Sequence, residues 1–270
     1  MNSTQVSAQS QSPAASAGRR LRILSYNIQV GITTLRPHHY LTHSWKHVLP
    51  HTQRLSNLDR IARLVSDFDV VALQEVDAGS LRSNYINQTE YLAERAHFPF
   101  WYHQVNRNLG HLAQHSNGLL SRYRPTEVSE LRLPGLIPGR GAIVARFGAS
   151  DESVAVFILH LALSRRARIR QLAYIGDLVN EYPHAILMGD MNCRPGSREM
   201  DILFKRTRLR EPPEEVLTFP SWRPQFHIDH ILVTPNLRVH DVQALNHAYS
   251  DHLPIAMEIE LPGTVNLLAS

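Results

Sequence analysis

Cysteine is almost absent from this 270-residue sequence, in which Cys193 stands alone. One thiol excludes an internal disulfide, and without a second thiol or a neighbouring histidine it is interpreted as a bystander in a turn. No apolar run approaches the ~20 residues that a membrane-spanning helix needs, and residues 1–20 lack the apolar stretch of a signal peptide. We therefore expect a cytoplasmic protein, with peripheral attachment to the inner membrane face as an open alternative.

Two common catalytic motifs are also missing. The sequence has no Gly-x-Ser-x-Gly elbow, which disfavours a serine hydrolase, and no P-loop, which disfavours nucleotide-driven work. Strong net charge is absent as well, because 28 Lys and Arg stand against 24 Asp and Glu, although the isoelectric point is about 9.4. This balance permits a phosphate-bearing partner and does not by itself indicate one.

The composition that remains is typical of a globular protein. Hydrophobic residues make up 43% of the chain, and its length suits one large α/β domain. The Ser-, Ala- and Gln-rich residues 1–20 are predicted to be a disordered tail, residues 21–263 a single domain, and residues 264–270 a C-terminal tail. No feature points to an obligate protein partner.

Apolar patterning predicts many strands and few helices. Helical periodicity covers residues 58–68 and 169–179. This balance favours stacked sheets flanked by helices over one doubly wound sheet. Residues 31–54 hold five histidines without clean periodicity, so we expect a long surface loop, with metal binding there as a minor alternative because no zinc spacing is present. The predicted strands are 20–29, 69–76, 118–122, 142–147, 153–163, 185–190, 228–233 and 254–261.

Asp190 and Asn192 follow one of these strands in the stretch HAILMGDMNCRPGS. Side chains two apart in extended backbone point the same way, so both polar groups are expected on one face at the strand end. A turn whose Asp and Asn bond only the local backbone is the structural alternative.

Other core-like strands also begin or end in polar residues. Taken singly, each has a structural explanation as a cap, an ion pair or a hydrogen-bonded core residue. Taken together at strand termini they favour a functional site, because ligands and catalytic groups collect where a rigid scaffold ends. These residues are Asn27, Glu75, His160, Asp229, His230, Asp251 and His252.

The residue types suit hydrolysis of a phosphate ester. Mg²⁺ prefers one or two carboxylates plus waters, and Glu75 fits that ligand with Asn27 beside it. Asp190 with Asn192 can supply a base and an orienting group for the attacking water. An imidazole held by a carboxylate is a donor of fixed tautomer, and His252 paired with Asp229 fits that description.

The motifs, read in order, resemble the endonuclease/exonuclease/phosphatase superfamily, which includes DNase I, abasic-site endonucleases, neutral sphingomyelinases and inositol-polyphosphate 5-phosphatases. The likeness runs from about Leu21 to Leu261. It implies a single catalytic domain built as a four-layer α/β/β/α sandwich, with two packed, mostly antiparallel sheets flanked by helices. The motifs that carry it are SYNIQ, LQEVD, SNGLLSR, HLALS, GDMNCRPGS, TFPSWRP with HIDHILV, and SDHLPI.

The resemblance also implies a metal site. Asn27 and Glu75 match the family's metal-binding positions, and Asp251 matches a residue that supports the metal side. The implied cofactor is Mg²⁺, with Mn²⁺ as an alternative.

Five positions match the family's catalytic residues. Asp190 would activate or position the nucleophilic water, and Asn192 would fix the phosphate. Asp229 would orient His252, which would contact the scissile phosphate. His160 matches the histidine that phosphodiesterase members place at the leaving-group side.

Two departures from the family pattern weaken an abasic-site reading. Gln29 stands where abasic endonucleases carry an acidic residue, and HLALSRRARIRQ stands where they carry a tyrosine motif. The 5-phosphatase signatures are not matched closely either. The segments HLALSRRARIRQL and TFPSWRP look most like small bacterial members of the superfamily.

Substrate contacts are predicted at Arg165, Asn117, Arg140 and Trp222. Arginines near residue 165 open a predicted helix, where they are either its solvated face or a response to a local anion, since cations are disfavoured there by the helix dipole. Trp222 is either a stacking surface or core. The further cationic candidates are Arg36, Lys46, Arg54, Arg166, Arg168 and Arg170.

The predicted function is a divalent-metal-dependent phosphodiesterase that acts on a lipid-derived or small phosphodiester by water attack at phosphorus. The first alternative is an endonuclease or exonuclease acting on DNA or RNA. The second, of another class, is an inert binding protein that retains the fold.

Overall fold

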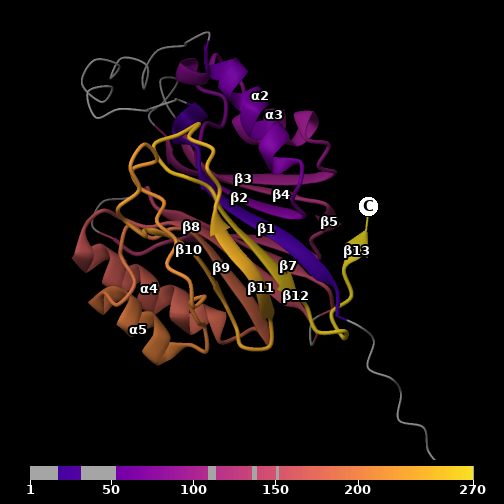
Figure 1. The fold of residues 1–270 in the computed structure, drawn as a ribbon, viewed down its shortest axis with the longest axis vertical. Coiled ribbons are helices and arrows are strands. Elements are labelled where there is room, and N and C mark those ends of the chain that lie inside the picture. The colour runs from indigo at the N-terminus through magenta and orange to yellow at the C-terminus, as the bar shows by residue number, and fades with distance from the viewer. Residues whose placement is uncertain (1–17, 32–52, 109–113, 136–138, 150–151, 270) are drawn as a thin grey trace, which may run out of the picture.

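The computed structural model describes residues 18–31, 53–108, 114–135, 139–149 and 152–269. It is a four-layer sandwich in which two sheets pack face to face and helices cover both outer faces (Figure 1). The predicted α/β/β/α architecture is confirmed. Most of the predicted tail 1–20 and of the predicted loop 31–54 lies outside the described residues, including Arg36 and Lys46.

The first sheet has six strands in the order β11-β12-β1-β2-β4-β3. Neighbours are antiparallel except β1 and β2, which are parallel. Helices α2 (Gln53–Val65) and α3 (Gln88–Arg95) cover its outer face (Figure 1). The strands are β1 (Arg20–Asn27), β2 (Val70–Val76), β3 (Phe100–Asn108), β4 (Gln114–Ser121), β11 (Arg238–Ala244) and β12 (Ile255–Glu260).

The second sheet has five strands in the order β10-β9-β8-β7-β6, with β8 and β9 parallel and the rest antiparallel. Helices α4 (Arg165–Val179) and α5 (Arg198–Arg206) cover its outer face (Figure 1). The strands are β6 (Glu127–Arg132), β7 (Gly141–Phe147), β8 (Val154–His160), β9 (His184–Asp190) and β10 (Asp229–Val233). The remaining elements are β5 (Tyr123–Arg124) and its partner β13 (Leu268–Ala269), and the 3₁₀ turns η1 (Gln29–Gly31) and η3 (Leu81–Ser83).

Three apolar clusters hold the layers together, one between the sheets and one under each helical layer. Ile23 of β1 joins the cluster between the sheets, whereas the next residue, Leu24, joins the cluster under α2 and α3. This alternation follows from the two-residue period of a strand. Because both faces of β8 and β9 are covered, all seven residues of each are buried, which explains their unbroken apolar runs.

The predicted strands correspond to observed strands, and the strands that prediction missed are mostly edges. β3, β6 and β11 lie at sheet edges and mix exposed polar side chains with half-buried ones, so they carry no apolar run. Two further details differ. Gln53 and Arg54, predicted as loop, begin α2, and the predicted strand 153–163 ends at His160. The division into tail, domain and tail stays a prediction, and within 264–270 the structure places β13 against β5.

No helix in the described part of the chain is both long and apolar enough to cross a membrane.

Gly189 is required where β9 approaches β8. Its φ is +144°, and a Cβ added there would lie 1.9 Å from the carbonyl oxygen of Leu159. We expect Gly189→Ala to lower the free energy of unfolding by at least the ~1–3 kcal/mol typical of overpacking, as measured by urea unfolding. Gly196→Ala is the matched control, because Gly196 also has positive φ (+68°) but nothing within 4 Å. Equal losses in the two variants would contradict the steric argument.

Candidate active site

Parallel strand ends gather the polar residues at one edge of the sandwich. His160 ends β8 and stands in register with Asp190 at the end of β9, and Asp190 stands opposite Asp229 at the start of β10. Side chains at paired positions of neighbouring strands lie on the same face of a sheet. The sheet register alone therefore brings three of the predicted residues together.

Asp190 is the centre of this group. Its Oδ1 accepts a hydrogen bond from the backbone N–H of Asn192 at 2.9 Å, and its Oδ2 accepts one from Nδ2 of Asn27 at 3.2 Å. The same Oδ2 lies 3.5 Å from Nε2 of His160 and 3.9 Å from Nε2 of His252. The Asn27 contact joins the two sheets, so packing of the sandwich completes the site.

His252 is held by Asp229. Its Nδ1 lies 2.8 Å from Oδ2 of Asp229, and that oxygen also accepts a hydrogen bond from the Thr218 hydroxyl. The Phe219 ring packs 4.8 Å from the imidazole, centre to centre. These contacts fix the ring and leave Nε2 directed toward Asp190. Thr218 and Phe219 lie in the TFPSWRP motif, yet sequence reasoning gave them no role.

Glu75 reaches the site through an irregular strand end. Its φ is +56°, and the pairing of β2 with β4 shifts register between Leu73 and Val76. A positive φ is costly for a residue with a Cβ and often marks a functional position. Its side chain keeps 30% exposure, and Oε1 lies 4.0 Å from Nε2 of His160.

Asn192 also adopts a positive φ, +51°. Its Nδ2 donates to the carbonyl of Leu161 at 3.1 Å, on the connection that leaves β8. The amide thus links the ends of β8 and β9 beside Asp190. The positions predicted as catalytic, His160, Asp190, Asn192, Asp229 and His252, therefore come together in the structure.

Burial and neighbouring charges shift the pKa values of the titrating groups in the site in different directions. Burial raises the pKa of Asp190 to about 7, against the lowering effect of His252. Burial acts to lower the pKa of His252. The carboxylates of Asp229 and Asp190 outweigh this effect and raise the pKa to about 10. Burial, with Arg140 next, holds the pKa of His160 well below its usual range. One histidine is therefore a cation and the other a neutral base at neutral pH.

The positions predicted to hold a metal carry hard oxygen donors. Burial and the charge of Asp251 raise the pKa of Glu75, while His252, Arg140 and a hydrogen bond with Asn27 lower it. The Glu75 and Asp251 carboxylates thus repel each other, a repulsion that a divalent cation relieves. This donor chemistry fits Mg²⁺ or Mn²⁺.

A second grouping of possible ligand atoms overlaps the predicted catalytic residues. Asp190, Asp229 and His252 offer atoms within 4.8 Å of one another. Asp229 and His252 already form a hydrogen bond with each other, so fewer of their atoms remain available to bind a metal. The oxygen set around Glu75 therefore remains the better match for a hard cation.

Of the four residues predicted to contact substrate, two line a pocket at the site and two do not. Arg140 and Arg165 line a pocket together with Glu75 and His160. Asn117 is fully buried, donates to the carbonyl of Gly141 at 3.0 Å and is not among the described residues that line the pocket, so its contact with substrate stays a prediction. β4 belongs to the six-stranded sheet, and the Asn117 side chain reaches Gly141 at the start of β7 in the five-stranded sheet. Trp222 is half-buried and is not among the described residues that line the pocket.

Two of the other cationic candidates, Arg168 and Arg54, are held within the fold. Arg168 forms an ion pair with Glu199 at 2.8 Å and donates to the Leu163 carbonyl. Arg54 is buried on α2. Cys193 is buried, and burial raises the pKa of its thiol to about 12.

Comparison with known proteins identifies similar proteins over most of the chain. A family model described as "Endonuclease/Exonuclease/phosphatase family" matches residues 24–252. An endonuclease/exonuclease/phosphatase from Beutenbergia cavernae DSM 12333 is similar in structure, with 20% identity and a TM-score of 0.68 over 90% of this chain and 72% of its own. No curated protein sequence matches significantly.

Two further structures share the fold. The mannosyl-6-phosphatase of Bacteroides thetaiotaomicron VPI-5482 has 18% identity and a TM-score of 0.66 over 88% of this chain and 99% of its own. A humanized D. rerio TDP2 has 18% identity and a TM-score of 0.63 over 89% and 98%. At these identities the likeness concerns the fold.

Proposed function

This chain belongs to the endonuclease/exonuclease/phosphatase family, whose members are metal-dependent hydrolases of phosphoric esters, and on that premise we propose that it is a phosphodiesterase. The proposed substrate is a lipid-derived or small phosphodiester, cleaved by water attack at phosphorus. Glu75, Asn27 and Asp251 would hold the divalent cation. When bound, the cation would neutralise charge on the phosphoryl oxygens.

The side chains divide the remaining work. Asp190, with its pKa raised to about 7 by burial, suits a general base for the attacking water, because a base works best when its pKa lies near the working pH. Asn192 orients the phosphate. His252, kept protonated by Asp229, donates from Nε2 to the phosphoryl oxygen, and His160 lies on the leaving-group side.

One observation supports this reading most strongly. Two histidines stand within 3.9 Å of the same buried carboxylate, and their pKa values are displaced in opposite directions. When the surroundings shift the pKa values of two titrating groups in opposite directions, one group can act as the acid and the other as the base. A purely structural histidine pair needs no such separation.

Nuclease activity is the second candidate. Arginines at the pocket beside Glu75 and His160 favour a substrate with more than one phosphate, as nucleic acids have. A phosphomonoester substrate has a precedent in the fold, since one similar structure is named a mannosyl-6-phosphatase.

Metal removal tests the proposal. We expect hydrolysis of bis-p-nitrophenyl phosphate to stop in EDTA and to return with Mg²⁺ or Mn²⁺, because the clustered carboxylates need a counter-charge. Glu75→Gln is expected to raise the metal concentration needed for half-maximal rate by tenfold or more. Glu258→Gln, which changes a half-buried β12 residue in an ion pair with Arg20, is the matched control. Full activity in EDTA would overturn the metal-dependent mechanism.

A substrate panel separates the alternatives. The panel comprises sphingomyelin, glycerophospholipids, inositol phosphates, plasmid DNA, abasic duplex and RNA, each with added metal. Turnover of the lipid or small diesters supports the proposal, and turnover of nucleic acid alone supports the nuclease. Absence of any turnover supports the inert binding protein.

A further inference from the structure

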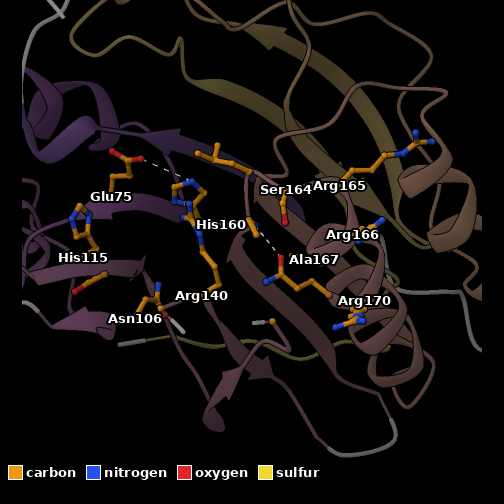
Figure 2. Close-up of a pocket in the computed structure, with 16 residues that line it drawn as sticks. Glu75, Asn106, His115, Arg140, His160, Ser164, Arg165, Arg166, Ala167 and Arg170 are labelled. Carbon is orange, nitrogen blue, oxygen red and sulfur yellow. Dashed lines mark hydrogen bonds and ion pairs between the residues drawn. The ribbon is translucent and has the colours of Figure 1, made fainter. Parts of the chain in front are cut away.

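A pocket of about 710 Å³ opens beside the candidate active site. Figure 2 shows Glu75, His115 and Asn106 on one side of it and the start of α4 on the other, with His160 and Arg140 between them. Its size lies within the range of small-molecule sites. A substrate whose phosphorus lies at Glu75 and His160 therefore has room to extend toward α4.

The far wall of this pocket is strongly basic. Arg165, Arg166 and Arg170 come from the first turns of α4 and form this wall (Figure 2). Arg140, from the connection before β7, lies beside His160, between this wall and Glu75. Glu75, at the opposite end, is the one acid among the described lining residues. The three α4 arginines thus form a cationic region separated from the metal-binding end.

The positive charges of the α4 arginines are only partly neutralised by nearby carboxylates. The Glu199 carboxylate forms ion pairs with both Arg165, at 3.4 Å, and Arg168, at 2.8 Å. Arg166 and Arg170 are exposed and have no ion-pair partner in the part of the chain that the structure describes. One carboxylate therefore stands against several guanidinium groups.

The start of α4 adds to this positive potential. The cap residue Ser164 makes no side-chain cap hydrogen bond, and the first turn contains no acid. Free N–H groups and the helix dipole make this end attractive to anions, so arginines placed there are unfavourable unless an anion is bound.

An independent observation comes from the opposite wall. Ser116 is 2% exposed and lines the pocket, and its Oγ has no hydrogen-bond partner among the described residues. Asn106 lines the same wall, and its buried Oδ1 also has none. Buried polar atoms normally have partners, so these groups indicate a polar ligand within the pocket. The Ser116 hydroxyl can donate to a phosphate oxygen, whereas the Asn106 Oδ1 can only accept, for example from a ligand hydroxyl.

We propose that this pocket binds a second phosphate group of the substrate, which makes the natural substrate a phosphodiester that carries a further phosphate on its leaving-group side. The inference rests on the proposed phosphodiesterase function. Arginine is well suited to the role, because its guanidinium binds phosphate through two hydrogen bonds. Two sources share this chemistry: a nucleotide with a terminal phosphate and a phosphorylated glycerophosphoinositol.

Matched substrate pairs test the pocket. The first pair is dithymidine phosphodiester with and without a terminal phosphate, and the second is glycerophosphoinositol with and without a ring phosphate. We expect the added phosphate to raise kcat/KM about tenfold in one pair, mainly through KM, because a charge-assisted contact forms. The pair that responds identifies the source of the phosphate.

The variant Arg166→Ala/Arg170→Ala is expected to remove that preference. The measured quantity is the ratio of kcat/KM for the phosphorylated and plain substrates, in which a general loss of activity cancels. Arg60→Ala, exposed on α2, is the control and should keep the wild-type ratio. The preference should also fall with added salt, since these charges are exposed.

Three results would overturn the inference. If bis-p-nitrophenyl phosphate is hydrolysed normally but neither added phosphate raises kcat/KM, the pocket assignment alone is wrong. The same follows if the double variant keeps the preference. If no diester is hydrolysed in the presence of Mg²⁺ or Mn²⁺, the proposed function fails and the pocket assignment fails with it.

Discussion

His252→Ala is expected to lower kcat for bis-p-nitrophenyl phosphate by about 10²–10⁴-fold, the range associated with loss of a positioned acid or base. The reason is the charge of this imidazole, whose pKa is raised to about 10 because Asp229 and Asp190 outweigh burial. Alanine removes the donor next to Asp190 and leaves Asp229 with only the Thr218 hydroxyl as a partner. Steady-state kinetics at saturating metal measure the effect.

Asp229→Asn distinguishes catalysis from simple damage to the fold. It keeps the size of the side chain but weakens the contact to Nδ1 of His252, now 2.8 Å. We expect a smaller loss of kcat and a shift of its pH profile, because the imidazole loses its stabilising charge. Circular dichroism and thermal unfolding check that both variants fold. A folded His252→Ala enzyme within threefold of wild-type kcat would show that His252 is not the donor.

The second large effect concerns stability. Arg82→Ala is expected to lower the free energy of unfolding by about 3–5 kcal/mol, because it leaves Asp77 as a buried charge without its partner. Asp77 is fully buried and accepts hydrogen bonds from Arg82 and from Ser80 and Ser83. Arg82 also donates to the carbonyl of Gln114 at 2.6 Å. Urea unfolding measures the loss.

A surface pair provides the control for this prediction. Arg206 and Asp177 form an ion pair at 2.9 Å with both side chains largely exposed, so Arg206→Ala should cost no more than about 1 kcal/mol. Equal losses at Arg82 and Arg206 would contradict the burial argument. The hydrogen bonds lower the pKa of Asp77 to about 2, although burial acts to raise it. The Asp77 carboxylate therefore stabilises the folded state above the ordinary pKa of an aspartate, and this stabilisation is lost as the pH falls toward 2.

The buried pair also bears on the site. Asp77 follows Glu75 by two residues and anchors the chain that leaves β2, where the 3₁₀ turn η3 begins. Asp77 is the final residue of the LQEVD motif, and the motif alone assigns it no role. Only the structure reveals that this carboxylate holds the turn behind Glu75.

Much of the architecture was predictable because burial leaves a direct trace in composition. Strands covered on both faces, such as β8 and β9, must be apolar throughout, and their runs were visible. Edge strands β3, β6 and β11 face solvent in part, so their mixed composition resembles that of loops. The short helices α3 and α5 span only two to three turns, which is too little to establish a periodic pattern.

The sequence by itself determined the family, the layered fold and the set of polar residues at strand ends, because hydrophobic patterning and motif order are properties of the linear chain. Only the tertiary structure decided how those residues combine. Asn27 meets Asp190 across 163 positions of sequence, Asn117 turns out to lie between the sheets, and the arginines of α4 line the pocket beside Glu75. Such contacts depend on the packing of two sheets against each other, and no local pattern encodes the distance between residues on different layers.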